Sequence, residues 1–536
     1  MTVSVAHANI GARFESRERL LVKQAFDFDV LATVDLGSNS FRLQICRKEG
    51  TQLFVIDSLK EMVRFGAGLG KDKYLSPESQ ERALSCLAKF GERLRGFATP
   101  QVRVVATNTF RVAKNIGPFL EQAEAVLGFP IEIIAGREEA RLIYLGVAHT
   151  SAVTDDKRLV VDIGGGSTEF VIGNGLVPQV TESLALGCVS HSLRFFPEGE
   201  VTEASVANAI WAARTEVQRI STMLKSVGWD VSIGTSGTAR SLSAVFEALG
   251  DARGMITLPA MKLLMNQIVR AGSVESAMVI GLKAERTEVF AGGLAVMIAI
   301  FEELAIEEME VTDAALRDGV LYDLIGRQLD ADMRDETVAR FQNRYRADVH
   351  QGEMVSDIAQ KYFEGMAKDL PVHEMGMWLS LIDWAAKLHE IGLSIAHTAY
   401  HKHSAYIVKN ADMPGFSKRE QNKLAVLILG HRGDMKKMLE QIGTDEYCWA
   451  AVLSLRLAAL FCRGRKDVCI PNNTKVKFQL SKKKCTLKIS NVWLELNPLT
   501  VSALVLEEAH WEKIGRDFTI KPLGALPETD AELYVE

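Results

Sequence analysis

The chain has few cysteines, few aromatic residues and no excess of positive charge. Its 7 cysteines are scattered over 536 residues without a C-x-x-C pair, and aromatic residues make up 7%. An odd number of scattered cysteines is typical of reduced thiols in a cytosolic protein and not of a disulfide framework. The 62 Lys and Arg against 68 Asp and Glu give a net charge of −6. A nucleic-acid-coating protein is therefore not expected, although a local basic groove is compatible with this balance.

Long apolar runs are also missing. A bilayer-spanning helix needs about 18 apolar residues, and the most apolar stretch, 289–301, is shorter and contains Gly292 and Gly293. The first 30 residues carry clustered Arg and Glu and lack the apolar core of a signal peptide. We expect a cytoplasmic protein without a transmembrane segment. At roughly 150 residues per domain, the length predicts about three to four domains.

One short pattern occurs twice. A strand, a tight turn and a returning strand are predicted by VLATVDLGSNSFRLQICR and again by RLVVDIGGGSTEFVIG. When the two are aligned, Asp35 matches Asp162 and Gly37 matches Gly164, 127 residues further along. This internal repeat predicts two similar α/β lobes, each with a hairpin at the mouth of a shared cleft.

Strands and amphipathic helices alternate up to about residue 328, which predicts an α/β architecture there. The expected strands are 102–106, 131–134 and one from Val231, and the expected helices are 137–148 and 201–226, the latter capped by Thr202.

Beyond residue 330 the pattern predicts almost only helix up to about 470. Alternating residues at 475–489 and in VWLEL then predict a β-rich ending. The expected domains are an N-terminal extension (1–29), lobe I (30–142), lobe II (143–328), a helical domain (329–472) and a small C-terminal α/β domain (473–536).

The strongest functional signal is the turn from Gly164 to Thr168. Gly164, Gly165 and Gly166 allow several backbone N–H groups to approach one anion, and the hydroxyls of Ser167 and Thr168 follow. A merely tight hairpin would need only one or two glycines. The turn therefore predicts phosphate binding, although its spacing is neither that of a P-loop nor that of a Rossmann fingerprint.

The matching turn of the first repeat supports this site. It contains Ser38, Asn39 and Ser40, which we expect to contact the same phosphate groups. Arg42 and Arg111 are the candidate cations, because guanidinium suits bidentate recognition of phosphate. Either arginine alone would more often be a surface ion-pair partner, but both follow predicted strands, where α/β proteins bind ligands.

Asp162 and Glu169 flank the glycine-rich turn. Two carboxylates beside a phosphate site would repel the substrate unless a cation lay between them. Mg²⁺ suits this combination, because it is usually held by one or two carboxylates together with phosphate oxygens and water. Asp162 alone could equally be a turn-stabilising aspartate.

Glu138 and Glu139 begin a predicted helix directly after a strand. In an isolated helix they would only be favourable N-terminal charges. At a strand end of an α/β protein, a general base is a reasonable role, and Glu139 is the candidate.

The helical region contains a cluster of five histidines, His389, His397, His401, His403 and His431. His389, His397 and His401 resemble the ligands of an HD-type metal phosphohydrolase, but Glu390 stands where that motif has Asp. Polar contacts within a helical core are the more common role of such histidines. A second active site is therefore a minor alternative.

The region 461–490 holds nine Lys or Arg against one Asp. This local excess, with Lys482, Lys483 and Lys484 within it, is either a solvated strand face or a track for a long polyanion.

Taken together, these motifs resemble the exopolyphosphatase / guanosine pentaphosphate phosphohydrolase (Ppx/GppA) family of the actin-like, ribonuclease-H-like superfamily. The resemblance rests on VDLGSNSFRL, ATNTFR, GREEARLIYLGV, VDIGGGSTEFVIG and GTSGTA, and continues through TDAALRDGVLYDL and HEIGLSIAHTAYHKHSAYIV. It implies two actin-like lobes with a cleft, an all-α HD-like domain, a small β-rich C-terminal domain and a homodimer.

The resemblance also implies roles for individual residues. Glu139 resembles the catalytic base of the family, and Asp162 and Glu169 resemble its magnesium-binding acids. The glycine-rich turn, together with Asn39, Arg42 and Arg111, resembles its phosphate-binding set. In this family the HD-like domain is not thought to be the catalytic centre, which agrees with Glu390.

The expected activity is that of an exopolyphosphatase, which releases orthophosphate from the end of inorganic polyphosphate with Mg²⁺. The alternative is removal of the 5′ phosphate of guanosine pentaphosphate (pppGpp) by the same chemistry. The basic C-terminal region favours the polymer, because a nucleotide needs no long cationic track. More remote alternatives are an actin-like kinase or ATPase and a non-catalytic sensor of polyphosphate or nucleotide. No nucleic-acid partner is expected.

Overall fold

The computed structural model describes residues 28–49, 52–150, 156–251, 254–328, 332–466, 470–471, 474–479 and 483–523. Most of the predicted N-terminal extension therefore lies outside the described residues. The described chain forms two compact units. The first contains the residues up to Met333 together with Pro414–Lys418, and the second contains Arg334–Met413 and the residues from Arg419 onward.

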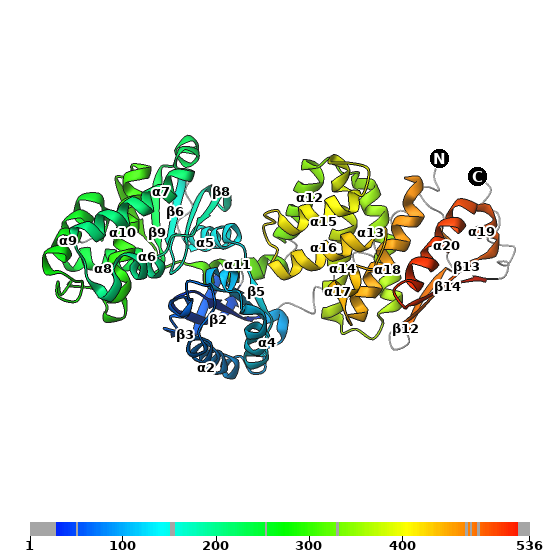
Figure 1. The fold of residues 1–536 in the computed structure, drawn as a ribbon, viewed down its shortest axis with the longest axis horizontal. Coiled ribbons are helices and arrows are strands. Elements are labelled where there is room, and N and C mark those ends of the chain that lie inside the picture. The colour runs from blue at the N-terminus through cyan, green and yellow to red at the C-terminus, as the bar shows by residue number, and fades with distance from the viewer. Residues whose placement is uncertain are drawn as a thin grey trace. The chain divides into compact units, whose positions relative to one another are not determined.

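A five-stranded sheet forms the first lobe of the first unit, in the order β3-β2-β1-β4-β5 (Figure 1). Strands β1 to β3 are antiparallel neighbours, whereas β4 and β5 run parallel to β1. The strands are β1 (Val30–Leu36), β2 (Phe41–Glu49), β3 (Gln52–Glu61), β4 (Val102–Ala106) and β5 (Ile131–Ile133), and the helices are α2 (Pro77–Arg93), α3 (Asn108–Val112) and α4 (Ile116–Leu127). Helix α5 (Gly136–Thr150) follows β5 and packs against the sheet of the second lobe.

A six-stranded sheet forms the second lobe, in the order β10-β11-β9-β6-β7-β8. Its strands are β6 (Lys157–Ile163), β7 (Thr168–Asn174), β8 (Val177–Leu184), β9 (Val231–Thr235), β10 (Ile256–Thr257) and β11 (Glu308–Val311). Its helices are α6 (Cys188–Phe195), α7 (Glu203–Val227), α8 (Ser236–Ala248), α9 (Leu258–Ala271) and α10 (Thr287–Leu304), and α11 (Leu316–Gln328) follows.

The repeated pattern occupies the same place in both lobes. Asp35 pairs with Arg42 across β1 and β2, and Asp162 pairs with Glu169 across β6 and β7. Each hairpin is joined in parallel to a third strand, β4 in one lobe and β9 in the other. The two similar α/β lobes expected from the repeat are therefore present.

The cap predicted at Thr202 forms as expected. The hydroxyl of Thr202 accepts a hydrogen bond from the backbone N–H of Ser205, and the Ser205 hydroxyl in turn accepts one from the N–H of Thr202, which caps α7.

Beneath the first hairpin, four buried phenylalanines pack together, with the rings of Phe65 and Phe110 4.9 Å apart. This packing holds the start of β2 against α3. The cluster is Phe41, Phe65, Phe110 and Phe119.

The second unit begins with a helical bundle and ends in a three-stranded sheet, β12-β13-β14. The helices are α12 (Met333–Arg344), α13 (Val349–Met366), α14 (Val372–Leu388), α15 (Tyr400–Asn410), α16 (Lys418–Gly430), α17 (Met438–Ile442) and α18 (Glu446–Phe461). The C-terminal elements are β12 (Lys475–Gln479), β13 (Lys484–Ser490), α19 (Asn491–Leu496), α20 (Pro498–Glu512) and β14 (Asp517–Leu523).

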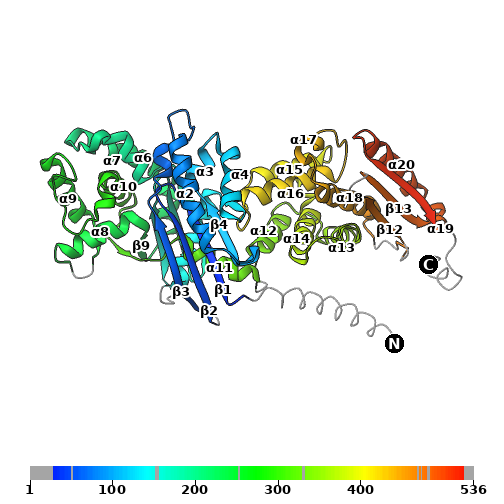
Figure 2. The ribbon, with the colours of Figure 1, turned by 90° about the horizontal axis from the view of Figure 1, so that it is seen from below.

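The strand expected in VWLEL is wrong, because this segment forms α19. The hydroxyl of Ser490 accepts a hydrogen bond from the N–H of Trp493 and caps the helix, and Trp493 packs edge-on against Phe461 at 5.8 Å. Strand β14 then returns parallel to β13, with α20 lying beside it (Figure 2).

One stretch in the described residues, Glu446–Gly464, has the length and mean hydropathy of a membrane span, which the apolar-run criterion did not identify. Within it, 78% of the apolar window is buried inside the protein. This is the environment of a core helix.

Candidate active site

The turns of the two hairpins lie against each other. A Cβ atom on Gly165 would lie 3.1 Å from the Cβ of Ser38 and 3.4 Å from the backbone nitrogen of Asn39. A Cβ on Gly166 would lie 2.6 Å from Oδ1 of Asn108. The glycines at these positions therefore allow a close approach that larger residues would prevent.

A cavity of about 620 Å³ opens between the lobes at these turns. Ten of the predicted site residues line it. They are Ser38, Asn39, Ser40, Arg42, Glu139, Asp162, Gly164, Gly165, Gly166 and Ser167.

Three other predicted residues, Arg111, Thr168 and Glu169, do not line the cavity. The hydroxyl of Thr168 is fully buried and donates to the backbone carbonyl of Leu186 at 2.5 Å, so it is engaged within the fold. Arg111 instead pairs with Glu139 of the cavity wall, and Glu169 accepts a hydrogen bond from the Ser183 hydroxyl.

Glu139 lies in the first turn of α5 and is 7% exposed. Its Oε2 accepts a hydrogen bond from Nη1 of Arg111 at 2.8 Å, and the same Nη1 lies 2.9 Å from the carbonyl oxygen of Ile134. Arg111 therefore orients the candidate base and does not face the cavity itself.

Carboxylates from both hairpins surround Glu139. Burial, opposed by Arg42 and reinforced by Glu139, raises the pKa of Asp35 to about 7. Burial, partly opposed by a hydrogen bond from Ser236, raises the pKa of Asp162 to about 6. Burial and the charges of Glu139 and Asp162 also raise the pKa of Glu169 well above its usual range. Each of these three carboxylates is therefore protonated more readily than it would be in water.

Hydrogen bonds hold these acids in place. The Ser236 hydroxyl donates to Oδ2 of Asp162 at 2.6 Å, and the Ser183 hydroxyl donates to Oε1 of Glu169 at 2.9 Å. Within the described part of the chain, no group of three or more His, Cys, Asp or Glu could hold a metal ion by itself. The donor set fits Mg²⁺ nevertheless, because this ion needs only one or two carboxylates and takes its remaining oxygens from phosphate and water.

Several cavity residues were not identified from the sequence. Asp35 could have been found from its match to Asp162 in the repeat. Asn108 lies within the ATNTFR motif, but nothing in its local pattern points to Gly166. Arg240 and Arg317 lie far from both hairpins in sequence, and together with burial they lower the pKa of Arg42.

Helix α8 forms one wall of the cavity from end to end. Ser236 contacts Asp162 at its N-terminus, and Arg240, Ser243 and Glu247 follow on the same face at helical spacing and line the same cavity. Eleven residues of helix span about 16 Å. The cavity thus extends well beyond the acidic centre.

The far part of the cavity differs from the part near the hairpins. Ser241, Ser243 and Glu247 of α8 line it, together with Lys283 and Arg286. The Nε atom of Arg286 is buried without a hydrogen-bond partner, and its Nη2 lies 3.4 Å from the Thr238 hydroxyl. This part of the cavity offers neutral, acidic and cationic groups side by side.

The histidines of the helical bundle do not form a metal centre among the described residues. The rings of His389 and His431 meet edge to face at 5.1 Å, and each Nδ1 lies 2.5 Å from a backbone carbonyl of its own helix. Burial lowers the pKa of both. His397 lies beside Tyr400, with 6.4 Å between ring centres.

One face of the C-terminal sheet is basic. Cross-strand register places Lys475 beside Lys488, and Lys488 beside Lys521. Lys484, on the same face, pairs with Asp517 at 3.9 Å. Lys483 lies exposed just before β13, and Lys482 lies outside the described residues.

The pattern that defines the Ppx/GppA phosphatase family matches residues 44–328, and that of Ppx/GppA phosphatase, domain III, matches residues 333–508. A guanosine-5'-triphosphate,3'-diphosphate pyrophosphatase of Pseudoalteromonas translucida is 36% identical over 491 residues, covering 91% of this chain and 97% of that protein. A protein of the same name from Aeromonas hydrophila is 37% identical over 489 residues, covering 90% and 97%. An exopolyphosphatase structure from Cytophaga hutchinsonii aligns with a TM-score of 0.51 and 23% identity, covering 55% of this chain and 98% of its own.

Proposed function

The chain belongs to the Ppx/GppA phosphatase family, and from this premise we propose that it removes the terminal 5′ phosphate of guanosine pentaphosphate. Both curated relatives described above carry a name for this chemistry. Water attacks the terminal phosphorus, the bond from phosphorus to the bridging oxygen breaks, and orthophosphate and guanosine tetraphosphate leave.

The residues at the hairpins suit this reaction. Glu139 takes the proton of the attacking water, and Arg111 keeps its carboxylate turned toward the cavity. The backbone N–H groups of the glycine-rich turn and the hydroxyl of Ser38 face the equatorial oxygens of the terminal phosphate. Phosphoryl transfer depends mainly on such positioning and on electrostatic stabilisation.

The far part of the cavity favours a nucleotide over a polymer. A polyphosphate chain extending along α8 has no hydrogen-bond donor for the carboxylate of Glu247, although Lys283 and Arg286 nearby would attract its charge. Guanine instead presents N–H donors on its Watson–Crick edge, and a carboxylate accepts these. This single observation carries the preference for pppGpp.

The proposal is tested by comparing kcat/KM for pppGpp with kcat/KM for long-chain polyphosphate at equal Mg²⁺. We expect pppGpp to be the better substrate by at least about tenfold, the effect of about one charge-assisted hydrogen bond. A clear preference for the polymer would overturn the assignment.

Replacing Glu247 with Ala is expected to raise KM for pppGpp by about tenfold, because one bidentate contact to the base is lost. KM for tripolyphosphate, which has no base, is expected to stay unchanged. Steady-state phosphate release measures both constants. Glu121→Ala is the matched control, because Glu121 is exposed on α4 and does not line the cavity. A parallel rise of KM for both substrates would contradict the base contact.

Mg²⁺ is the proposed cofactor, held by Asp162 and Glu169, and Asp35 lines the same cavity. When bound it would neutralise the charge that develops on the phosphate oxygens. EDTA is expected to abolish phosphate release and added Mg²⁺ to restore it. Asp162→Asn is expected to raise the Mg²⁺ concentration needed for half-maximal activity by about tenfold or more. Full activity of metal-free wild-type protein would contradict this part of the proposal.

Exopolyphosphatase activity is the second candidate, and the lysine face of the C-terminal sheet is the observation that favours it. Lys475, Lys488 and Lys521 lie side by side across three strands. Such a face attracts a long polyanion more than a single nucleotide. The substrate comparison above decides between the two activities.

A further inference from the structure

Glu138 and Glu139 are neighbours in the first turn of α5, but their carboxylates have different surroundings. Glu139 lines the cavity, whereas Glu138 does not and is only 4% exposed. Arg141 donates from Nε and Nη2 to the two oxygens of Glu138, both at 2.8 Å. A bidentate pair of this kind fixes the orientation of the side chain.

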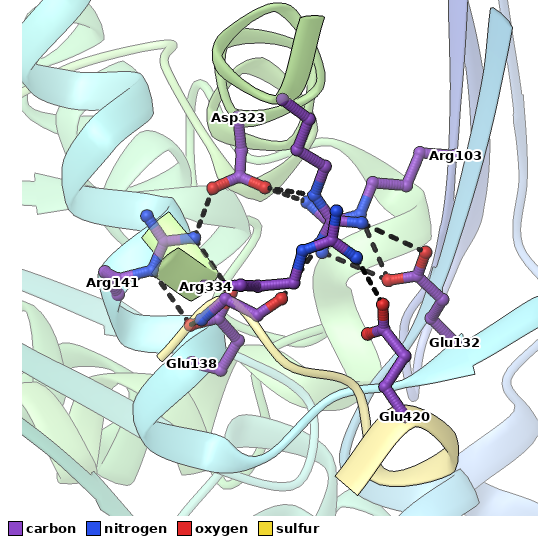
Figure 3. Close-up of polar contacts among 9 residues, drawn as sticks. Arg103, Glu132, Glu138, Arg141, Asp323, Arg334 and Glu420 are labelled. Carbon is purple, nitrogen blue, oxygen red and sulfur yellow. Dashed lines mark hydrogen bonds and ion pairs between the residues drawn. The ribbon is translucent and has the colours of Figure 1, made fainter. Parts of the chain in front are cut away.

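Arg141 joins Glu138 to α11 (Figure 3). Its Nη2 also donates to Oδ1 of Asp323 at 2.5 Å, and Arg103 of β4 donates to Oδ2 of Asp323 at 2.6 Å. Burial alone would raise the pKa of Asp323, but Arg141, Arg103 and Arg327 hold it far below its usual range. The start of α5 is therefore tied to α11 and β4 through buried ion pairs.

A distant segment completes this network. The backbone N–H of Gly415 donates to Oε2 of Glu138 at 2.9 Å, and the carbonyl of Gly415 accepts from Nη2 of Arg327 at 2.9 Å. Arg327 also donates from Nε to Asp323 at 3.1 Å. Gly415 thus fits between the carboxylate of α5 and the guanidinium of α11. It belongs to Pro414–Lys418, which lies in the first unit although the residues on either side of it in sequence belong to the second.

We propose that Glu138 is a positioning residue for the candidate base Glu139, and that Pro414–Lys418 is part of the same network of ion pairs and hydrogen bonds. The first turn of a helix lacks part of its internal hydrogen bonding and frays easily. Here the contacts of Glu138 with Arg141 and Gly415 stabilise the first turn of α5. The neighbouring carboxylate of Glu139 therefore keeps its orientation. The inference rests on the proposed role of Glu139, but not on the identity of the substrate.

Two variants test whether Glu138 and Gly415 position Glu139. Glu138→Asp keeps the charge but shortens the side chain, so that it no longer reaches both Arg141 and Gly415. Gly415→Ala disturbs the backbone that donates to Glu138. Gly415 has φ +87°, a backbone conformation that residues other than glycine rarely adopt. In both we expect kcat to fall by about tenfold or more with KM within about twofold, the pattern of a misplaced catalytic group.

Gly128→Ala is the matched control. Gly128 has φ +83° in the same unit, ends α4, and has open space around it. Amide hydrogen exchange of residues 136–141 gives a second readout that needs no substrate. Exchange is expected to accelerate in Glu138→Asp and Gly415→Ala and to stay at the wild-type rate in Gly128→Ala.

Unchanged exchange of residues 136–141 in Gly415→Ala would overturn the proposal. So would equal losses of kcat in Gly415→Ala and Gly128→Ala, since a general loss of stability would then suffice. If the wild-type protein released no phosphate from any substrate, the proposed function would fail, while the exchange experiment would still decide whether Gly415 and Glu138 hold α5.

Discussion

Replacing Glu139 with Gln is expected to lower kcat by about 10²–10⁴-fold, which is the usual contribution of a general base to the rate of catalysis. Glutamine keeps the size of the side chain and can still contact Arg111, but it cannot take a proton from water. KM is expected to change little, because the groups that hold the phosphates remain. Phosphate release under saturating substrate measures the effect.

Glu182→Gln is the control for this experiment. Glu182 also lies on the first unit and is also paired with an arginine, Arg137, at 2.8 Å, but it does not line the cavity. We expect its kcat to match that of the wild type. A Glu139→Gln protein that releases phosphate at the wild-type rate would remove Glu139 from the mechanism, and the base would then have to be sought among Asp35 and Asp162.

Acidification is expected to destabilise the second unit strongly. Burial lowers the pKa of His389, and burial together with the charge of His389 lowers the pKa of His431 well below its ordinary value. Both are therefore neutral in the folded chain, whereas in the unfolded chain they take up protons below about pH 6.5. Their stabilising contribution is present above that pH and is lost as the pH falls toward the folded pKa values. Two such groups together lose up to about 3 kcal/mol per pH unit.

Urea unfolding followed by tryptophan fluorescence at pH 7, 6 and 5 measures this slope. His431→Gln, which cannot be protonated, is expected to reduce the slope even where it lowers stability at pH 7. His373→Gln is the control, because His373 is largely exposed at 45% and only approaches Glu374. A urea midpoint that stayed constant from pH 7 to pH 5 would show that these histidines do not set the acid stability.

Much of the site was predictable from short segments. The Asp-x-Gly turns, the helix that carries Glu139 and the capped helix at Thr202 depend on residues close together in sequence, and they form as the local pattern predicts. The repeat also predicted that Asp35 and Asp162 occupy equal places, which their cross-strand partners confirm. The strand expected in VWLEL was wrong, because capping by Ser490 and packing of Trp493 outweigh the alternation of apolar residues.

By itself, the sequence determined that two glycine-bearing hairpins exist and which acids accompany them, because backbone turns and strand alternation arise from neighbouring residues. Only the tertiary structure decided that Arg111 holds Glu139, that α8 extends the cavity to Glu247, and that Gly415 completes the surroundings of Glu138. These relationships join residues far apart in the chain. Their physical basis is the burial of charged groups against distant partners, which no local pattern records.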